Sequence, residues 1–412
     1  MSSFLDRYEA LIGRLPGDSR LRADAADAFR ASGIPGEQRR RAEAWKYTSL
    51  RPVAETAFRA AGPVHEAETI LRRLPLLDAP CAVFVDGALR DDLTAEPGLA
   101  GCSSRFALTP DFGTLTRPDQ EPMVALNTML AEDGLVLEVG AGDDFGTLQI
   151  VHIAASNGDF HPRHIIRLRE NARLALIEHA AGDGIYLTNT VTEVHLAAGA
   201  HLTHIRIQQD ASTAFHVSTV YADVGPGATY DSFTLSLGGR LSRTEAHVGL
   251  NGPKAMAHLN GANLLTGAQH ADFTSVVRHE APNCQSRQTV KNVLAGRARG
   301  VFQGRIEVAR DAQKTDGYQM NQALLLSPEA EIDSKPELEI FADDVKCSHG
   351  ATVGELDAEQ LFYLRSRGVP EAEARAILVH AFLSELLDTI ADDTIRDHLE
   401  RIVETRWESL IA

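Results

Sequence analysis

Cys347, Ser348 and His349 form the group of residues in the sequence best suited to binding a metal. On an extended segment residues i and i+2 share a face, so the Cys347 thiolate and the His349 imidazole can converge on one metal such as iron. Two ligands do not complete a site, and a partner, a water or a remote side chain must supply the rest. A buried thiol beside an unrelated histidine is the plainer alternative.

Other polar pairs are weaker candidates. They are two histidine pairs spaced by three residues and one adjacent aspartate pair: His161/His164, His201/His204 and Asp343/Asp344. On a strand, residues at these spacings point to opposite faces, so each pair would need a bend to chelate a metal. The sequence contains no G-x-x-x-x-G-K-[ST], G-x-S-x-G or H-E-x-x-H motif, and we expect no nucleotide site of its own.

The composition is that of an ordinary globular protein: 412 residues, 44% hydrophobic and 24% charged. The formal net charge of -17 disfavours a nucleic-acid partner. The four cysteines contain no C-x-x-C pair and do not resemble a secreted disulfide framework. No signal peptide is recognisable, and no apolar run reaches the ~18 residues of a membrane span. We therefore expect a soluble, cytoplasmic protein without a membrane partner.

The elements that must position Cys347 and His349 fall into four expected regions. Residues 1–75 form an N-terminal helical region and 76–135 a mixed α/β connecting region. Residues 136–350 form a core of short β-prone runs separated by small-residue turns, and 351–412 form a C-terminal helical domain.

The β-rich region has a regular spacing. Alanines at 172, 200, 228 and 255 follow turn residues at steps of 28, 28 and 27, whereas later turns at Ala298 and Ala330 fit with irregular steps of 43 and 32. A period near 28 without helices favours the stacked coils of a β-solenoid. A β-sandwich or jelly roll, with strands every 8–12 residues, is the alternative.

Two C-terminal helices carry apolar stripes that must pack against something. The first stripe comprises Ala374, Ile377, Leu378, Phe382, Leu386 and Ile390. The stripes pack against the chain's own core or also against a partner. We expect truncation after Gly368 to leave the β-rich core folded.

Three segments carry a family resemblance. They are DDVKCSHGATVGELDAEQLFYLRSR at 343–367, the stretch leading into it from Gly317, and EAWKYTSLRP at 43–52. The chain resembles the SufB/SufD family of iron–sulfur cluster assembly proteins across nearly its whole length. Within that family it is most like SufD, because it is shorter than SufB-type chains and Gly350 follows His349.

The resemblance implies a right-handed parallel β-helix flanked by N- and C-terminal helical domains. It also implies a non-enzymatic scaffold subunit of a SufB–SufC–SufD complex, supporting cluster assembly and iron acquisition, with ATP hydrolysis supplied by SufC. Reduced flavin is associated with that complex, but no residue here places it. A homodimer of the isolated chain is also compatible with the sequence.

The resemblance further implies site residues. Cys347 and His349 match a cysteine and a histidine at the SufB interface, where they would hold iron or a nascent iron–sulfur cluster shared with SufB. With SufC as partner, the first apolar stripe predicts a docking surface at Ile377, Leu378, Phe382 and Leu386. A carbohydrate-active β-helix enzyme and a pure interaction subunit without metal chemistry are the alternative functions.

Overall fold

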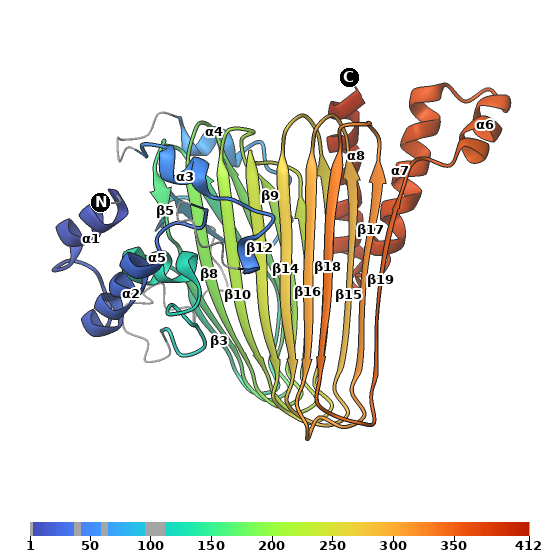
Figure 1. Ribbon diagram of the computed structural model, residues 1–412. Coiled ribbons are helices and arrows are strands. Elements are labelled where there is room, and N and C mark those ends of the chain that lie inside the picture. Colours follow the sequence, from blue (N-terminus) through green and yellow to red (C-terminus); the bar gives the residue numbers. More distant parts are fainter. Residues whose placement is uncertain (1–2, 37–42, 59–64, 95–111, 412) are drawn as a thin grey trace.

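The chain folds into a parallel β-solenoid flanked by helices at both ends of the sequence (Figure 1). The computed structural model describes residues 3–36, 43–58, 65–94 and 112–411. From β6 onwards successive strands alternate between a ten-stranded sheet, in the order β19-β17-β15-β13-β11-β9-β7-β4-β1-β2, and a nine-stranded sheet, in the order β18-β16-β14-β12-β10-β8-β6-β3 with β5 beside β8. Apart from the antiparallel pair β1–β2, neighbouring strands are parallel, as a solenoid requires and a sandwich does not.

The strands of the ten-stranded sheet are β1 (Cys81–Val85), β2 (Ala88–Leu89), β4 (Asp144–Ala154), β7 (Arg173–Gly182), β9 (His201–Gln209), β11 (Thr229–Ser236), β13 (Met256–Leu265), β15 (Gln285–Leu294), β17 (Asp316–Leu325) and β19 (Lys346–Gly354). The strands of the nine-stranded sheet are β3 (Val136–Val139), β5 (Asp159–Phe160), β6 (Arg163–Leu168), β8 (Leu187–Leu196), β10 (Phe215–Val224), β12 (Leu241–Leu250), β14 (His270–His279), β16 (Arg299–Val308) and β18 (Glu331–Ile340).

The alanine spacing marks the turns at one edge of the solenoid. Each of the alanines at 172, 200, 228 and 255 is buried and follows a residue with positive φ. In the next turn Cys284 takes the same place, buried behind Asn283 at φ 62°. Ala298 lies in a turn at the opposite edge, where Gly296 stacks on Gly267. The irregular steps found in the sequence therefore came from mixing two sets of turns.

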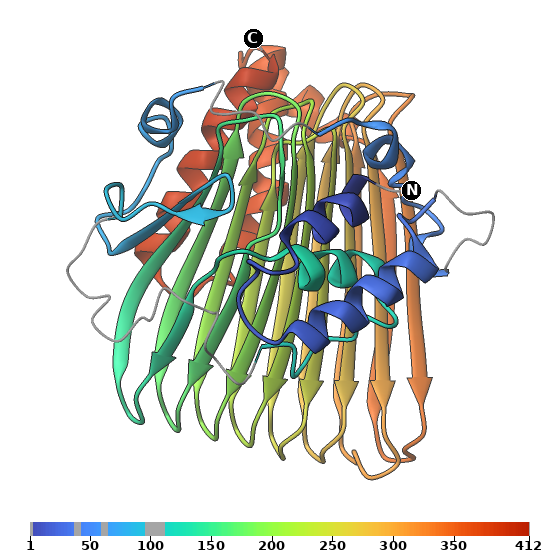
Figure 2. The ribbon, with the colours of Figure 1, turned by 90° about the vertical axis from the view of Figure 1, so that its left-hand side faces the viewer.

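The nine-stranded sheet and the ten-stranded sheet are each covered on the outer face by a different group of helices (Figure 2). The N-terminal helices α1 (Ser3–Leu11), α2 (Ser19–Ser32) and α5 (Pro122–Leu130) pack with Trp45 against the outer side chains of Phe215 and Leu241 on the nine-stranded sheet. Two short helical segments follow α2, η1 (Glu43–Trp45) and α3 (Arg51–Glu55). Helix α4 (Ala67–Leu71) packs instead against β1 and β4 of the ten-stranded sheet.

The C-terminal helices pack on the outer face of the ten-stranded sheet. These are α7 (Glu371–Leu387) and α8 (Asp393–Ile411), preceded by the exposed α6 (Ala358–Ser366). Their buried side chains, among them Leu383 and Leu399, meet Ile205, Phe233 and Leu264 of the sheet in one apolar cluster. The apolar stripes thus pack largely against the chain's own core, and the expectation that this core is independent of them needs revision.

The observed strands cross the expected region boundaries at two places. Strand β1 lies within 76–135 yet pairs with β4 as part of the ten-stranded sheet. At the other end β19 runs to Gly354, four residues past 350. Among the helices that the structure describes, none combines the length and apolarity needed to cross a membrane.

Candidate functional site

The solenoid ends in two edge strands that pair on one side only. β19 pairs with β17, and β18 pairs with β16. Three apolar side chains near this edge are exposed: Ile340, Phe341 and Val353. Unpaired edge strands are templates for strand addition unless something covers them. We call the surface formed by β18, β19 and the turn between them the open end.

Cys347 and His349 lie on β19 at the open end. Their pairing partners on β17 are Gly317 and Gln319, and the spacing of two places both side chains on one face of the strand. Cys347 is half-buried and packs against Ile306 and its neighbours, whereas His349 is exposed. Among the described residues no third metal-binding side chain joins these two. The shared face is confirmed, and the metal role stays a prediction.

The electrostatic setting of Cys347 favours the neutral thiol in the isolated chain. Burial raises the pKa of the Cys347 thiol, and the charge of Asp316 adds to the effect against an opposing hydrogen bond from the Gly317 backbone. A metal must therefore displace the proton to recruit the thiolate.

The remaining cysteines have structural surroundings or lie outside the described residues. Cys81 is buried on β1, and burial raises its thiol pKa to about 11. Cys284 is fully buried, with its sulfur 3.2 Å from the Gly252 carbonyl oxygen. Cys102 lies outside the described residues.

The expected divergence of the spaced histidine pairs is confirmed for the pair on β9. His201 Nε2 lies 2.9 Å from Asp231 at the surface, whereas His204 points into the solenoid and bonds Glu178 at 2.7 Å. Asp343 and Asp344 are both exposed in the bend that precedes β19.

The C-terminal stripe divides into a buried and an exposed part. Leu386 is 2% exposed within the apolar cluster against the solenoid, and Phe382 is partly buried with Lys291 above its ring. Ile377 is 43% exposed, and Leu378 is half-buried. Of the four residues expected to dock SufC, Leu386 is thus covered by the chain itself, whereas Ile377 is exposed and Leu378 and Phe382 are partly exposed.

Ile377 and Leu378 line a groove of about 830 Å³ between α6 and α7. Across the groove, α6 presents Phe362 at 73% exposure and Tyr363 at 56%. Asp357 caps α6 by accepting hydrogen bonds from two backbone N–H groups, as its place in the sequence predicts. Large exposed apolar surfaces of this kind mark interaction sites.

Part of the solenoid interior is polar. The Nε2 atoms of His152 and His164 come within 3.3 Å, and Glu178 bonds His204 at 2.7 Å and lies 3.9 Å from His152. Burial lowers the pKa of His152 to about 4 and of His164 to about 3. Both imidazoles are therefore neutral at pH 7.

Acid should destabilise the fold through His152 and His164. A free histidine titrates near pH ~6.5, so below that pH the unfolded chain takes up protons that the folded chain excludes. Their stabilisation is complete above pH ~6.5 and is lost as the pH falls towards 4 and 3, on the order of 6 kcal/mol for the two together by pH 4. Urea unfolding across this pH range measures the slope.

Groups facing these histidines must be considered in the same experiment. Burial raises the pKa of Glu178, but the hydrogen bond and charge of His204 outweigh it, and the lowered pKa adds a loss of the same sign below pH ~4.5. The charges of Asp210 and His216 also act on His152. His164→Asn should flatten the slope between pH 6.5 and 4. An unchanged slope in this variant would contradict the assignment.

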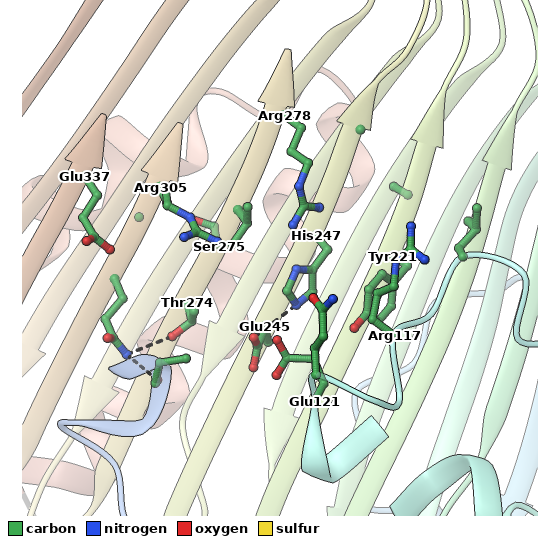
Figure 3. Close-up of a pocket in the computed structure, with 18 of the residues that line it drawn as sticks. Arg117, Glu121, Tyr221, Glu245, His247, Thr274, Ser275, Arg278, Arg305 and Glu337 are labelled. Atoms are coloured by element: carbon green, nitrogen blue, oxygen red, sulfur yellow. Dashed lines mark hydrogen bonds and ion pairs between the residues drawn. The ribbon is translucent and has the colours of Figure 1, made fainter. Parts of the chain in front are cut away.

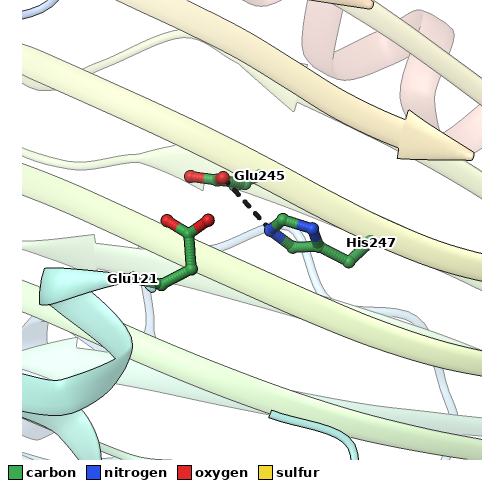
Figure 4. Close-up of side chains that lie close together, drawn as sticks. All are labelled: Glu121, Glu245 and His247. Atoms are coloured by element: carbon green, nitrogen blue, oxygen red, sulfur yellow. Dashed lines mark hydrogen bonds and ion pairs between the residues drawn. The ribbon is translucent and has the colours of Figure 1, made fainter. Parts of the chain in front are cut away.

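A cavity of about 600 Å³ lies between the outer face of the nine-stranded sheet and the segment leading into α5 (Figure 3). Glu245 and His247 project into it from β12, and Glu121, the residue before α5, faces them (Figure 4). The potential ligand atoms of these three residues all lie within 4.8 Å of one another. The alternation of Arg243, Glu245 and His247 along one strand was a detectable signal in the sequence. Nothing in it pointed to Glu121.

Comparison with known proteins settles the family. A family model described as "SUF system FeS cluster assembly, SufBD core domain" matches residues 151–382, more than half of the chain. The chain belongs to the SufB/SufD family. The matched region covers most of the solenoid, including the open end, together with α6 and much of α7.

Full-length relatives align with nearly the whole of this SufB/SufD family member. The Escherichia coli K12 "Iron-sulfur cluster assembly protein SufD" is 32% identical over 378 residues, covering 89% of this chain and 88% of the relative. "Iron-sulfur cluster assembly SufBD family protein slr0076" of Synechocystis is 30% identical, with 93% and 90% covered. "Protein ABCI7, chloroplastic" of Arabidopsis thaliana is 28% identical, with 93% and 85% covered. These similarities support the SufD-like character expected from the sequence.

Proposed function

We propose that the chain is a SufD-like, non-catalytic scaffold subunit for iron–sulfur cluster assembly in the cytoplasm. Its partners would be a SufB-like subunit, meeting it at the open end, and a SufC-like ATPase, and iron acquisition and reduced flavin belong to the proposed complex. The observation that carries the proposal is the placement of Cys347 and His349 on one face of an edge strand. The family membership supports the process.

The proposed chemistry requires the partner. Cys347 offers one thiolate and His349 one neutral imidazole, which leaves an iron ion or cluster short of ligands. The exposed His349 and the unpaired edge of β19 are where a second subunit could supply them. In the absence of a SufB-like subunit, a second copy of this chain has access to the same edge, which is our proposal for a homodimer.

Replacing either proposed ligand should reduce cluster formation without unfolding the chain. In the complex co-expressed with SufB-like and SufC-like partners, Cys347→Ala and His349→Ala should each lower iron affinity about tenfold or more. The measurement is cluster absorbance after anaerobic purification, beside circular dichroism and subunit stoichiometry.

Cys284→Ala is the matched control for the loss of a thiol. Alanine already occupies the equivalent place in four preceding turns, at 172, 200, 228 and 255, so the substitution fits the turn. This variant should keep wild-type cluster content, as should Cys81→Ala. Wild-type cluster content in the Cys347→Ala, His349→Ala double variant would refute the ligand role and favour a pure interaction subunit.

A SufC-like ATPase is proposed to dock in the groove between α6 and α7. Ile377→Asp places a charge in that groove, and co-purification of the ATPase should fall steeply because burying an unpaired carboxylate is costly. Ile12→Asp is the matched control, because Ile12 is 54% exposed on the N-terminal side of the molecule. Equal recovery of the ATPase with both variants would remove the groove from the proposal.

The carbohydrate-active alternative has little support. Two carboxylates, Glu121 and Glu245, do converge on one face of the solenoid. However, one oxygen of Glu245 accepts hydrogen bonds from Arg243 and the other is 3.1 Å from His247. The family model, which covers most of the solenoid, describes cluster assembly instead.

A further inference from the structure

We propose that the cavity beside α5 binds a divalent first-row transition-metal ion through Glu121, Glu245 and His247. The site lies on the outer face of the nine-stranded sheet, whereas Cys347 and His349 are on the last strand of the other sheet. It is therefore a second metal site that goes beyond the proposed scaffold function and does not depend on it.

The spacing of the ligand atoms suits a metal ion. Nε2 of His247 and Oε1 of Glu245 are 3.1 Å apart. Two adjacent ligands at about 2.1 Å from a metal are separated by about 3.0 Å in octahedral and about 3.4 Å in tetrahedral geometry. Glu121 has its carboxylate within 4.8 Å of both atoms, and its rotatable side chain can close the remaining gap.

Two of the three ligands are held in place by their neighbours. Arg243 is fully buried and donates to Oε2 of Glu245 from Nε at 3.1 Å and Nη2 at 3.0 Å, which leaves Oε1 for the metal. The Tyr221 ring stacks on the His247 imidazole with centroids 4.6 Å apart and planes 9° apart. Tyr221 and His247 are register partners on β10 and β12. Groups that orient ligands in this way strengthen metal binding.

The charges around the cavity favour a cation over an anion. Glu121 has no hydrogen bond or ion pair from its carboxylate among the residues that the structure describes. Three of the cations that line the cavity already have carboxylate partners: Arg278 and Arg305 pair with Glu307, and Lys335 pairs with Glu43 and Glu337. The fourth, Arg117, is exposed.

The ligand set identifies the class of metal. One imidazole nitrogen with two carboxylate oxygens suits Mn²⁺, Fe²⁺, Co²⁺ or Zn²⁺, whereas Mg²⁺ and Ca²⁺ prefer oxygen ligands alone. Three protein ligands also leave coordination positions open towards the cavity of about 600 Å³. Water or a small anionic molecule has room to complete the coordination.

Cobalt titration of the full-length chain tests the site. The chain carries Cys347→Ala and His349→Ala to remove the other proposed ligands, and EDTA strips it of metal first. We expect one equivalent of Co²⁺ to bind with d–d absorbance and without the thiolate charge-transfer band that cysteine ligation produces. In the same background Glu121→Gln and His247→Gln should each weaken binding about tenfold or more.

Glu337→Gln is the matched control, because Glu337 lines the same cavity outside the proposed ligand set, and it should bind Co²⁺ like its parent. Should a ligand variant fold poorly, the parent's melting temperature with and without Zn²⁺ replaces it, and a rise on adding metal is expected. The proposal is overturned if the parent binds no stoichiometric Co²⁺, or if the Glu121→Gln, His247→Gln double variant binds it unchanged. Cluster content at Cys347 and His349 is measured separately, so either proposal can fail without the other.

Discussion

Replacing Arg163 with methionine is expected to destabilise the chain by about 3–5 kcal/mol, the usual consequence of removing one partner of a buried ion pair. Arg163 on β6 and Glu193 on β8 are both fully buried, and Nη2 lies 2.7 Å from Oε1. Methionine approximates the length of the side chain but leaves the Glu193 carboxylate without its cation. The result should be a large fall in the denaturant midpoint.

The pair also joins the solenoid to its N-terminal covering. The Arg163 guanidinium donates to Asn127 and Thr128 on α5 at 3.1 and 3.3 Å. The Glu193 carboxylate accepts from the backbone N–H groups of Gly113 and Leu115, both at 2.8 Å. Loss of Arg163 therefore disturbs the attachment of α5 as well as the pair itself.

An exposed ion pair supplies the comparison for Arg163→Met. Arg73 and Asp183 are 2.6 Å apart, with 56% and 38% of their side chains exposed. Arg73→Met should change the unfolding free energy by less than about 1 kcal/mol, because solvent screens such pairs. If the two methionine variants unfold at the same urea concentration, the buried ion pair does not stabilise the fold more than the exposed pair does.

Deleting residues 369–412 is expected to destabilise the whole solenoid, in contrast to the expectation from sequence. The deletion removes α7 and α8 and uncovers the outer face of the ten-stranded sheet. The buried side chains lost are Val379, Leu383, Leu386, Leu387, Ile390, Ile395, Leu399, Ile402 and Val403. At about 1.5–3 kcal/mol for each buried large side chain, the gross loss exceeds 10 kcal/mol, comparable to the ~5–15 kcal/mol that stabilises a typical domain.

The truncated chain should aggregate, bind a hydrophobic dye and melt far below the intact chain. Size-exclusion chromatography and thermal unfolding measure these effects. The variant Ile377→Asp keeps both helices and should melt close to the wild type, because its side chain is 43% exposed. A monomeric truncated chain with an unchanged melting temperature would show that the solenoid does not need its C-terminal covering.

The solenoid was predictable because its turns repeat in sequence. The buried alanines at 172, 200, 228 and 255 recur at fixed steps since each turn stacks on the previous one. The spacing after Ala255 is irregular for two reasons. Cys284 replaces alanine in the fifth turn of this edge, and Ala298 belongs to the turns of the opposite edge. Periodicity reports that a residue is in a turn but not on which edge.

The site was predictable only where its residues are close in sequence. The shared face of Cys347 and His349 follows from a spacing of two on one strand. Glu121 and His247 are 126 positions apart, and only folding the α5 segment over the sheet brings them together. An apolar stripe likewise predicts that Leu386 is buried, but not that the covering surface is the chain's own sheet.

The single-sided pairing of β19 has a consequence for the local energetics of the molecule. In a stack of turns each unit is stabilised by its two neighbours, so cooperativity runs along one dimension and a terminal unit lacks half of its support. Such a unit frays first, with an opening free energy well below that of the central turns. Cys347 and His349 therefore lie on a terminal segment of the solenoid, which opens at a lower energetic penalty than the central turns. A partner that docks against β19 supplies the neighbour that this strand lacks. Its binding free energy is therefore coupled to the ordering of the Cys347 thiol and the His349 imidazole.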